Sequence, residues 1–260
     1  MNVSDRIRKK TVQAIYDYRM LQNGDHVLVG VSGGIDSTVL LLTLKEIQKK
    51  SPYKFNITPI FLDQNFPDSN ARLFLNWIRQ KGFDPIVLKF DSFSIIEAKT
   101  KPNKSICRIC SRLRRGILYT YAFENNYSKI ALGHQLDDYN EALLLSLTYS
   151  GKMKSMAPNW KSLDGRNTII RPLSYLPKST LLLLQNELNF PVLNCRFCEE
   201  SLKESGREKI RELMKAFEIL NPDYHLNMFA AQKNIAFNQL PTINRGTDSS
   251  EKLKISASYK

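Results

Sequence analysis

The sequence predicts an α/β protein with a Rossmann-like parallel sheet that helices cover on both faces. Short apolar segments rich in valine and isoleucine alternate along the chain with longer segments of helical periodicity, which is the pattern of repeated βαβ units. Polar residues follow three of the predicted strands directly, as expected at the carboxyl edge of a parallel sheet, where ligands bind. With 260 residues, 42% of them hydrophobic, the chain can form one such domain with appended helices.

The predicted elements of the first half follow this alternation. A helix over Val3–Met20 comes first, and Asn23-Gly24 separates it from a buried strand over Val27–Val31. The next elements are a helix over Ser37–Lys49, a strand over Asn56–Leu62, a helix over Ser69–Lys81, a strand over Pro85–Phe90, a helix from about Ser111 to Asn125 and a strand over Lys129–Leu132.

The second half contains fewer strand patterns and more helical ones. An extended segment over Asn167–Ile170 precedes the helices predicted at Ser179–Leu188, Ser201–Leu220 and Tyr224–Asn234. The expected organisation is therefore an N-terminal helix (1–24), a central α/β domain that carries the cysteines (25–198), a C-terminal helical extension (199–237) and a flexible tail (238–260).

The segment SGGIDS at Ser32–Ser37 is the strongest functional signal. It connects the first strand to the first helix of the sheet, where Gly33 and Gly34 permit close backbone approach. The serine hydroxyls and the free N–H groups at the start of the helix can donate to a phosphate, which the helix dipole also favours. The spacing matches neither a dinucleotide fingerprint nor a Walker loop. Two glycines, two serines and Asp36 within six residues exceed what a tight turn requires, so we expect a phosphate site.

Further polar residues follow the second and fourth strands. Asp63 ends the apolar run IFLD, where an unpaired carboxylate would be costly, so Mg²⁺ or a nucleotide is its expected partner. Gly133 and His134 follow the fourth strand, and His134 is either a hydrogen-bonded residue at a strand end or a catalytic one. The acids at 137, 138 and 141 suit a helix N-terminus, and Asp138 and Glu141 share a helix face that could contribute to metal or ATP binding.

The net charge of +13 is concentrated in two segments. Residues 99–115 contain seven Lys or Arg and no acid, and residues 152–178 contain six against Asp164 alone. A solvated surface remains an alternative, but such concentration favours a polyanion, and the nearby Trp160 and Tyr175 make a structured RNA the expected partner. The candidate RNA contacts are Arg112, Arg114, Arg115, Lys152 and Lys154.

The four cysteines form two CxxC pairs, Cys107 with Cys110 and Cys195 with Cys198. Zinc, an iron–sulfur cluster and redox thiols all remain open for such pairs. The two pairs are too far apart in sequence for a compact zinc ribbon, so they must meet through tertiary folding.

These motifs resemble those of a known superfamily and of one family within it. SGGIDS is similar to the SGGxDS signature of the PP-loop ATPases, the adenine nucleotide alpha hydrolase superfamily. Over most of residues 20–235, the runs CRICSRLRRGILY, KIALGHQLDDYNEALLLSLTYSGKMKSM, RPLSYL and FPVLNCRFC resemble the tRNA-cytidine 2-sulfurtransferase family, in that order. His134-Gln135 departs from the pair of histidines that many relatives have.

The resemblance implies a fold, a reaction and a set of site residues. It implies ATP with Mg²⁺ at Ser32, Gly33, Gly34, Asp36 and Ser37, with Asp63, Gly133, His134 and Asp138 also at the nucleotide site. It also implies a [4Fe-4S] cluster on Cys107, Cys110 and Cys195, which makes Cys107, Cys195 and Asp63 the expected catalytic residues. Three cysteine ligands leave one iron of the cluster without a protein ligand. Cys198 is then either not a ligand, or it is a fourth ligand that would bind this iron.

The expected reaction is tRNA thiolation, in which ATP adenylates the C2 oxygen of a cytidine, at position 32 by the resemblance, and sulfur replaces it. We expect a cysteine desulfurase or another sulfur donor as a partner. A second copy of the chain, in a homodimer, is another expected partner. The alternatives are a lysidine-synthetase type ligase with structural zinc and a non-catalytic RNA-binding module. The chain lacks a long apolar run and begins MNVSDRIRKK, so we expect a soluble cytoplasmic protein without a membrane partner.

Overall fold

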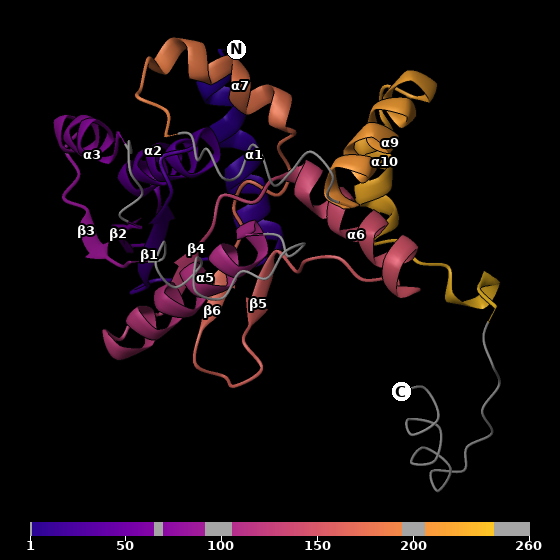
Figure 1. Cartoon of the computed structure of the whole chain (residues 1–260), viewed down its shortest axis with the longest axis horizontal. Helices are drawn as coiled ribbons and strands as arrows, with labels where there is room; N and C mark the ends of the chain where they lie inside the picture. Colours follow the sequence, from indigo (N-terminus) through magenta and orange to yellow (C-terminus); the bar gives the residue numbers. More distant parts are fainter. Residues whose placement is uncertain (1, 65–69, 92–105, 194–205, 242–260) are drawn as a thin grey trace, which may run out of the picture.

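The computed structural model contains a six-stranded sheet in the order β3-β2-β1-β4-β6-β5 (Figure 1). The structure describes residues 2–64, 70–91, 106–193 and 206–241. Neighbouring strands are parallel except at the edge, where β5 is antiparallel to β6. The predicted α/β class with a mostly parallel sheet is therefore confirmed. The strands are β1 (His26–Val31), β2 (Asn56–Asp63), β3 (Ile86–Lys89), β4 (Lys129–Ala131), β5 (Asn159–Lys161) and β6 (Thr168–Ile170).

The helices agree with the expected alternation, with differences at their ends. The predicted first helix ends at Asp17 rather than Met20, because Arg19 adopts a positive φ of 48° and turns the chain. The helices are α1 (Val3–Asp17), α2 (Ile35–Lys50), α3 (Ala71–Gln80), α5 (Ile106–Glu124), α6 (Leu136–Ser150), α7 (Lys178–Leu188), α9 (Gly206–Leu220), α10 (Tyr224–Ala231) and a short 3₁₀ helix (Phe237–Gln239).

Two boundaries matter for function. The helix predicted from about Ser111 extends back to at least Ile106, so Cys107 and Cys110 belong to α5 rather than to a loop before it. The strand β5 was not predicted, because a three-residue edge strand is too short to show a pattern of alternation.

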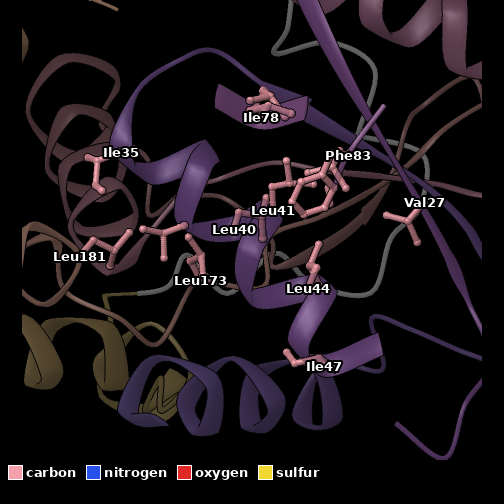
Figure 2. Packing of buried hydrophobic residues seen from close by; sticks show 14 of the residues in the cluster. Val27, Ile35, Leu40, Leu41, Leu44, Ile47, Ile78, Phe83, Leu173 and Leu181 are labelled. Atoms are coloured by element: carbon pink, nitrogen blue, oxygen red, sulfur yellow. The ribbon is translucent and has the colours of Figure 1, made fainter. Parts of the chain in front are cut away.

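The two faces of the sheet have separate apolar cores. On β1, Val27, Val29 and Val31 face the larger core, which α1, α2, α3 and α7 complete, and Figure 2 shows Leu40, Leu41 and Leu44 of α2 packed within it. Leu28 points the other way, toward Leu118 and Ala122 of α5. This alternation follows from the two-residue period of a strand that is buried on both sides.

The helices α6, α9 and α10 form a group beside the sheet, seen at the right in Figure 1. Leu144 of α6 packs on Ile210, Met214 and Tyr224 in a small core of their own. Within the described ranges, no helix is both long and apolar enough to cross a bilayer.

Candidate functional site

The loop between β1 and α2 has the geometry of an anion site. Gly33 has a φ of +82°, and Gly34 is the N-cap of α2 without a side-chain hydrogen bond to the first helical N–H groups. The hydroxyls of Ser32 and Ser37 lie 3.1 Å apart, and the Ser32 N–H donates to Ser37 Oγ at 3.0 Å. A tight hydroxyl-lined turn at a helix N-terminus can accept a phosphate.

Gly133 brings the end of β4 against this loop. A Cβ at this position would lie 2.9 Å from the carbonyl carbon of Asp36 and 3.0 Å from the Ser37 nitrogen. Only a glycine therefore allows the chain after β4 to approach the first turn of α2. This close approach gives a physical reason for a glycine at position 133, which the sequence predicts at the nucleotide site.

The segment after α7 also contacts the phosphate loop. The Leu193 N–H donates to the Gly33 carbonyl oxygen at 3.0 Å, and a Cβ on Gly33 would lie 2.4 Å from the Leu193 side chain. Leu193 precedes Cys195 by two residues. The chain that leads to the second cysteine pair thus passes directly over the loop, although Cys195 and Cys198 themselves lie outside the described residues.

The acids near the loop are destabilised as carboxylates. Burial raises the pKa of Asp36, Asp137 raises it further, and Lys178 at 3.9 Å opposes the shift. Burial also raises the pKa of Asp138 to about 6, against the hydrogen bond that its carboxylate accepts from the Gln135 N–H at 2.9 Å. Asp36 Oδ1 is buried and has no hydrogen-bond partner among the described residues. A divalent cation would supply the missing partner and the missing charge.

A cavity of about 240 Å³ adjoins Asp138. It lies between α6, α7, α9 and α10, and Asp137 and Asp138 line it together with Lys178. Asp137 also accepts a hydrogen bond from the Lys178 N–H at 2.7 Å, which fixes the start of α7 beside α6. The contact of Lys178 with Asp137 was not predicted from the sequence. Its position one residue before a predicted helix was the only local indication that it lies at a helix start.

His134 is a neutral base in this environment. Burial, together with the positive charges of Arg171 and Arg115, lowers its pKa to about 3. Its Nδ1 is buried and has no hydrogen-bond partner in the described part of the chain. His134 is therefore available as a hydrogen-bonding group for a ligand, but not as a cation.

Glu141 has a structural role. Its carboxylate pairs with Arg211 Nε at 2.9 Å and with Arg207 Nε at 3.2 Å, both on α9. These two ion pairs account for a carboxylate that is only 9% exposed. The possible contribution of Glu141 to metal or ATP binding has no support in this arrangement.

Asp63 and Cys110 approach the same edge of the sheet. Asp63 is the last residue of β2, and the next residue, Gln64, accepts a hydrogen bond from Cys110 Sγ at 2.7 Å. Cys110 is buried in the second turn of α5, and Cys107 lies one helical turn before it. The edge that holds the phosphate loop therefore also receives Cys110, through a contact with Gln64 that no local pattern predicts.

The candidate RNA contacts occupy two exposed regions. Arg112 and Arg115 are exposed on α5, and Arg114 is half-buried there. Lys152 and Lys154 are exposed in the segment that follows α6. Lys154 also lines a second cavity, of about 370 Å³.

The model of the PP-loop domain family matches residues 4–192. A tRNA-cytidine(32) 2-sulfurtransferase of Coxiella burnetii is 38% identical over 239 residues, which cover 90% of this chain and 93% of the relative. One of Bdellovibrio bacteriovorus is 39% identical over 237 residues, with 90% of each chain covered.

Among solved structures, the fold is similar to that of the U34-tRNA thiolase NcsA from Methanococcus maripaludis, described with its [4Fe-4S] cluster. The TM-score is 0.65 at 21% identity, and the match covers 88% of this chain and 78% of the thiolase. This likeness supports the fold that the sheet order already indicates.

Proposed function

We infer the function of this chain from its family, since it belongs to the PP-loop family and, within it, to the tRNA-cytidine(32) 2-sulfurtransferases. It is an ATP-using tRNA sulfurtransferase. The observation that carries this conclusion is the identity of 38–39% over nine-tenths of the chain, with the relatives covered at 90% or more. We propose the roles of the individual residues from the geometry of the site.

The first half of the reaction needs an activated oxygen. The C2 oxygen of cytidine is a poor leaving group, and its attack on the α-phosphate of ATP converts it into an adenylate and releases pyrophosphate. The phosphate loop Ser32–Ser37 would hold the pyrophosphate portion through N–H and hydroxyl donors. Asp36 and Asp138 suit a Mg²⁺ ion, because burial disfavours their charge until a cation is present.

Asp63 and His134 are the proposed polar contacts to the nucleotide. Asp63 ends β2 next to the central strand, and His134 follows β4 on the other side. Because His134 remains neutral, it can accept or donate a hydrogen bond without repelling Mg²⁺. These two positions flank the phosphate loop at the carboxyl edge, where nucleotides bind in open α/β sheets.

The second half of the reaction needs sulfur next to the activated carbon. Thiolates are the ligands of iron–sulfur clusters, and the position of Cys110 beside Gln64 fits such a site at the nucleotide edge. A [4Fe-4S] cluster held by Cys107, Cys110 and Cys195 would have one iron without a cysteine ligand, which can carry the sulfur. The contact of Leu193 with Gly33 supports this set, because it directs the chain before Cys195 toward the same edge.

The remaining proposals concern partners. A cysteine desulfurase or another sulfide source must supply the sulfur, and the exposed arginines of α5 are proposed to contact tRNA phosphates close to the cysteines. A cytoplasmic location and a homodimer are the corresponding expectations for a tRNA-modifying enzyme.

Anaerobic purification and nucleoside analysis test the proposal together. We expect a brown protein with about four irons, and 2-thiocytidine in tRNA incubated with ATP and sulfide. Cys110→Ser should lose the iron and the formation of 2-thiocytidine. Cys198→Ser should keep the iron and the product if three cysteines are the ligands. A colourless protein with stoichiometric zinc would contradict the cluster, and loss of iron in Cys198→Ser would identify a four-thiolate site. Absence of 2-thiocytidine with a fully loaded wild-type protein would contradict the cytidine substrate.

A further inference from the structure

A second cavity, of about 370 Å³, lies on the face of α6 that points away from the acids of the nucleotide site. Tyr139 and Leu143 of α6 line it, whereas Asp137, Asp138 and Glu141 line the smaller cavity. At 100° per residue these two sets project from opposite sides of the helix. The larger cavity, called here the aromatic–lysine pocket, is completed by Tyr18, Met153, Lys154, Ser155, Met156, Ala157, Pro158, Phe229, Gln232, Lys233 and Ile235.

The pocket has a fixed cation at its wall. The Lys233 ammonium lies over the rings of Tyr175 at 4.9 Å, Phe229 at 5.0 Å and Tyr18 at 6.0 Å. These rings hold the ammonium by cation–π attraction, and no carboxylate of the described residues forms an ion pair with it. Lys233 Nζ also donates to Tyr175 Oη at 3.5 Å, and Tyr175 Oη donates to Asp17 Oδ2 at 2.7 Å, so the Asp17 carboxylate is linked to the ammonium only through the tyrosine hydroxyl.

Two tyrosines of the lining have buried hydroxyls. Tyr139 is 1% exposed, and its hydroxyl lacks a partner among the described residues, as does the hydroxyl of Tyr18. Both hydroxyls are covered by protein atoms, that of Tyr139 beside Ser174 and that of Tyr18 beside Tyr175, so a ligand in the pocket would contact ring surface rather than these hydroxyls. The rings and methionines around them supply apolar surface for a flat group.

Hydrogen bonds hold the walls of the pocket in place. Ser155 Oγ donates to the Tyr139 carbonyl oxygen at 2.8 Å, and Arg171 donates to the Ala157 carbonyl oxygen, so the segment after α6 is fixed on one side. On the other side, Gln232 Nε2 donates to Asn140 Oδ1 at 3.1 Å and fixes the end of α10 to α6. The pocket is thus formed before any ligand arrives.

The charged residues that line the two cavities differ. The described residues that line the aromatic–lysine pocket include Lys154 and Lys233 and no acid. The smaller cavity is lined by acids and bases together, with Lys178, Arg211 and Lys215 beside Asp137, Asp138, Glu141 and Glu218. A volume of about 370 Å³ is within the range of small-ligand sites and large enough for one nucleotide.

We propose that the aromatic–lysine pocket binds one unpaired nucleotide of the tRNA, outside the nucleotide to be thiolated. Its base packs among the aromatic rings and methionines, and its phosphate lies against Lys233 and Lys154. Proteins bind single-stranded nucleic acid in this way, with apolar and aromatic side chains against the bases and basic side chains along the backbone. The inference rests on the proposed function in that it takes tRNA as the substrate, and it adds a contact that orients this substrate across α6.

Two variants of different kind test the pocket. Lys233→Gln keeps the aliphatic chain and removes the charge, and Met153→Trp places a large ring at a rim position that is 57% exposed. We expect the Kd for tRNA to rise about tenfold in each, with the slope of log Kd against log salt reduced by about one in Lys233→Gln alone. The Kd for ATP should stay at the wild-type value in both. Lys81→Gln is the matched control, since Lys81 lies 5.3 Å over the ring of Trp77, on α3 and outside the pocket.

The results separate this proposal from the proposed function. Unchanged tRNA binding in both variants, with 2-thiocytidine formed at the wild-type rate, would overturn the pocket while leaving the enzyme assignment intact. An equal loss in Lys81→Gln would also overturn it, because the effect would then reflect net charge alone. Absence of thiolation in the wild-type protein with normal tRNA binding would instead contradict the proposed function.

Discussion

Gly133 illustrates how a single hydrogen atom in place of a side chain assembles this site. It allows the chain after β4 to contact the first turn of α2, where a Cβ would approach backbone atoms of Asp36 and Ser37 to within 3.0 Å. Backbone atoms cannot move aside as the end of a flexible side chain can. The distance between His134 and the phosphate loop therefore depends on this residue.

Gly133→Ala should displace the chain after β4 from α2. We expect the free energy of unfolding to fall by about 1–3 kcal/mol, as for other overpacked positions, and the Kd for ATP to rise at least about tenfold. Chemical denaturation and ATP titration provide the measurements. Gly116→Ala is the control, because no atom lies near its Cβ position in α5, and alanine there should stabilise the helix by up to about 1 kcal/mol. Wild-type ATP affinity in Gly133→Ala would contradict this reading.

Asp138 is the acid whose charge the fold disfavours most clearly. Burial raises its pKa to about 6, and the neighbouring Asp36 and Glu141 contribute in the same direction. In the unfolded chain the group titrates near 3.8. The folded protein therefore retains this proton to higher pH, and stability decreases as pH rises from about 4 to about 6 without a cation.

Asp138→Asn should remove this part of the pH dependence. Without Mg²⁺ and ATP, we expect the variant and the wild-type protein to differ little near pH 4, and the variant to be more stable by about 1–3 kcal/mol above pH 6.5. The asparagine oxygen can still accept from the Gln135 N–H, so the start of α6 should be preserved. Urea denaturation at several pH values provides the measurement. Stability curves that remain parallel from pH 4 to pH 8 would show that Asp138 is not the group responsible.

At the scale of elements, α6 connects the two functional halves of the molecule. Its N-terminal residues approach the phosphate loop, its opposite faces line two cavities, and Glu141 holds α9 through Arg207 and Arg211. The arginines remain partly hydrated, at 63% and 41% exposure, while the carboxylate is almost covered. These ion pairs add to the apolar contacts of Leu144 with Ile210, Met214 and Tyr224 in holding α9 and α10 on α6.

Glu141→Gln should loosen the docking of α9. We expect the loss of about 1 kcal/mol of stability, because the exposed arginines can regain water once their partner is neutral. Hydrogen exchange should become faster in residues 206–231 and stay unchanged in β1. Glu46→Gln is the control, since its pair with Lys49 is exposed and contributes little. Equal exchange rates in the two variants would argue against this role.

At the scale of the whole molecule, the sheet collects residues that are far apart in sequence at one edge. The phosphate loop, Asp63 and Gly133 follow three adjacent parallel strands, and Cys110 joins them through Gln64. The acids of α6 and their basic neighbours Lys178 and Arg211 lie on one face of this helix, and the aromatic–lysine pocket lies on the other. The two cavities therefore open on different sides of α6.

The sequence by itself determined the alternation of strands and helices, the phosphate loop and the cysteine pairs. These are local features, set by apolar periodicity, by glycine and serine in one turn, and by spacing along the chain. The sequence also predicted that polar residues after the strands would converge, because parallel strands present their carboxyl ends at one edge. The assignment of Cys195 and Cys198 remains a prediction, since both lie outside the described residues.

The tertiary structure alone decided the contacts between distant segments. Gln64 with Cys110, Leu193 with Gly33, and Glu141 with the arginines of α9 join residues that no local pattern relates. The aromatic–lysine pocket is a further case, because its lining comes from α1, α6, the segment after α6 and α10. Side-chain burial, and with it the raised pKa of Asp138 and the lowered pKa of His134, depends on which elements pack together. Packing is a property of the folded chain, so the chemistry of these groups could be assigned only after the elements were placed in space.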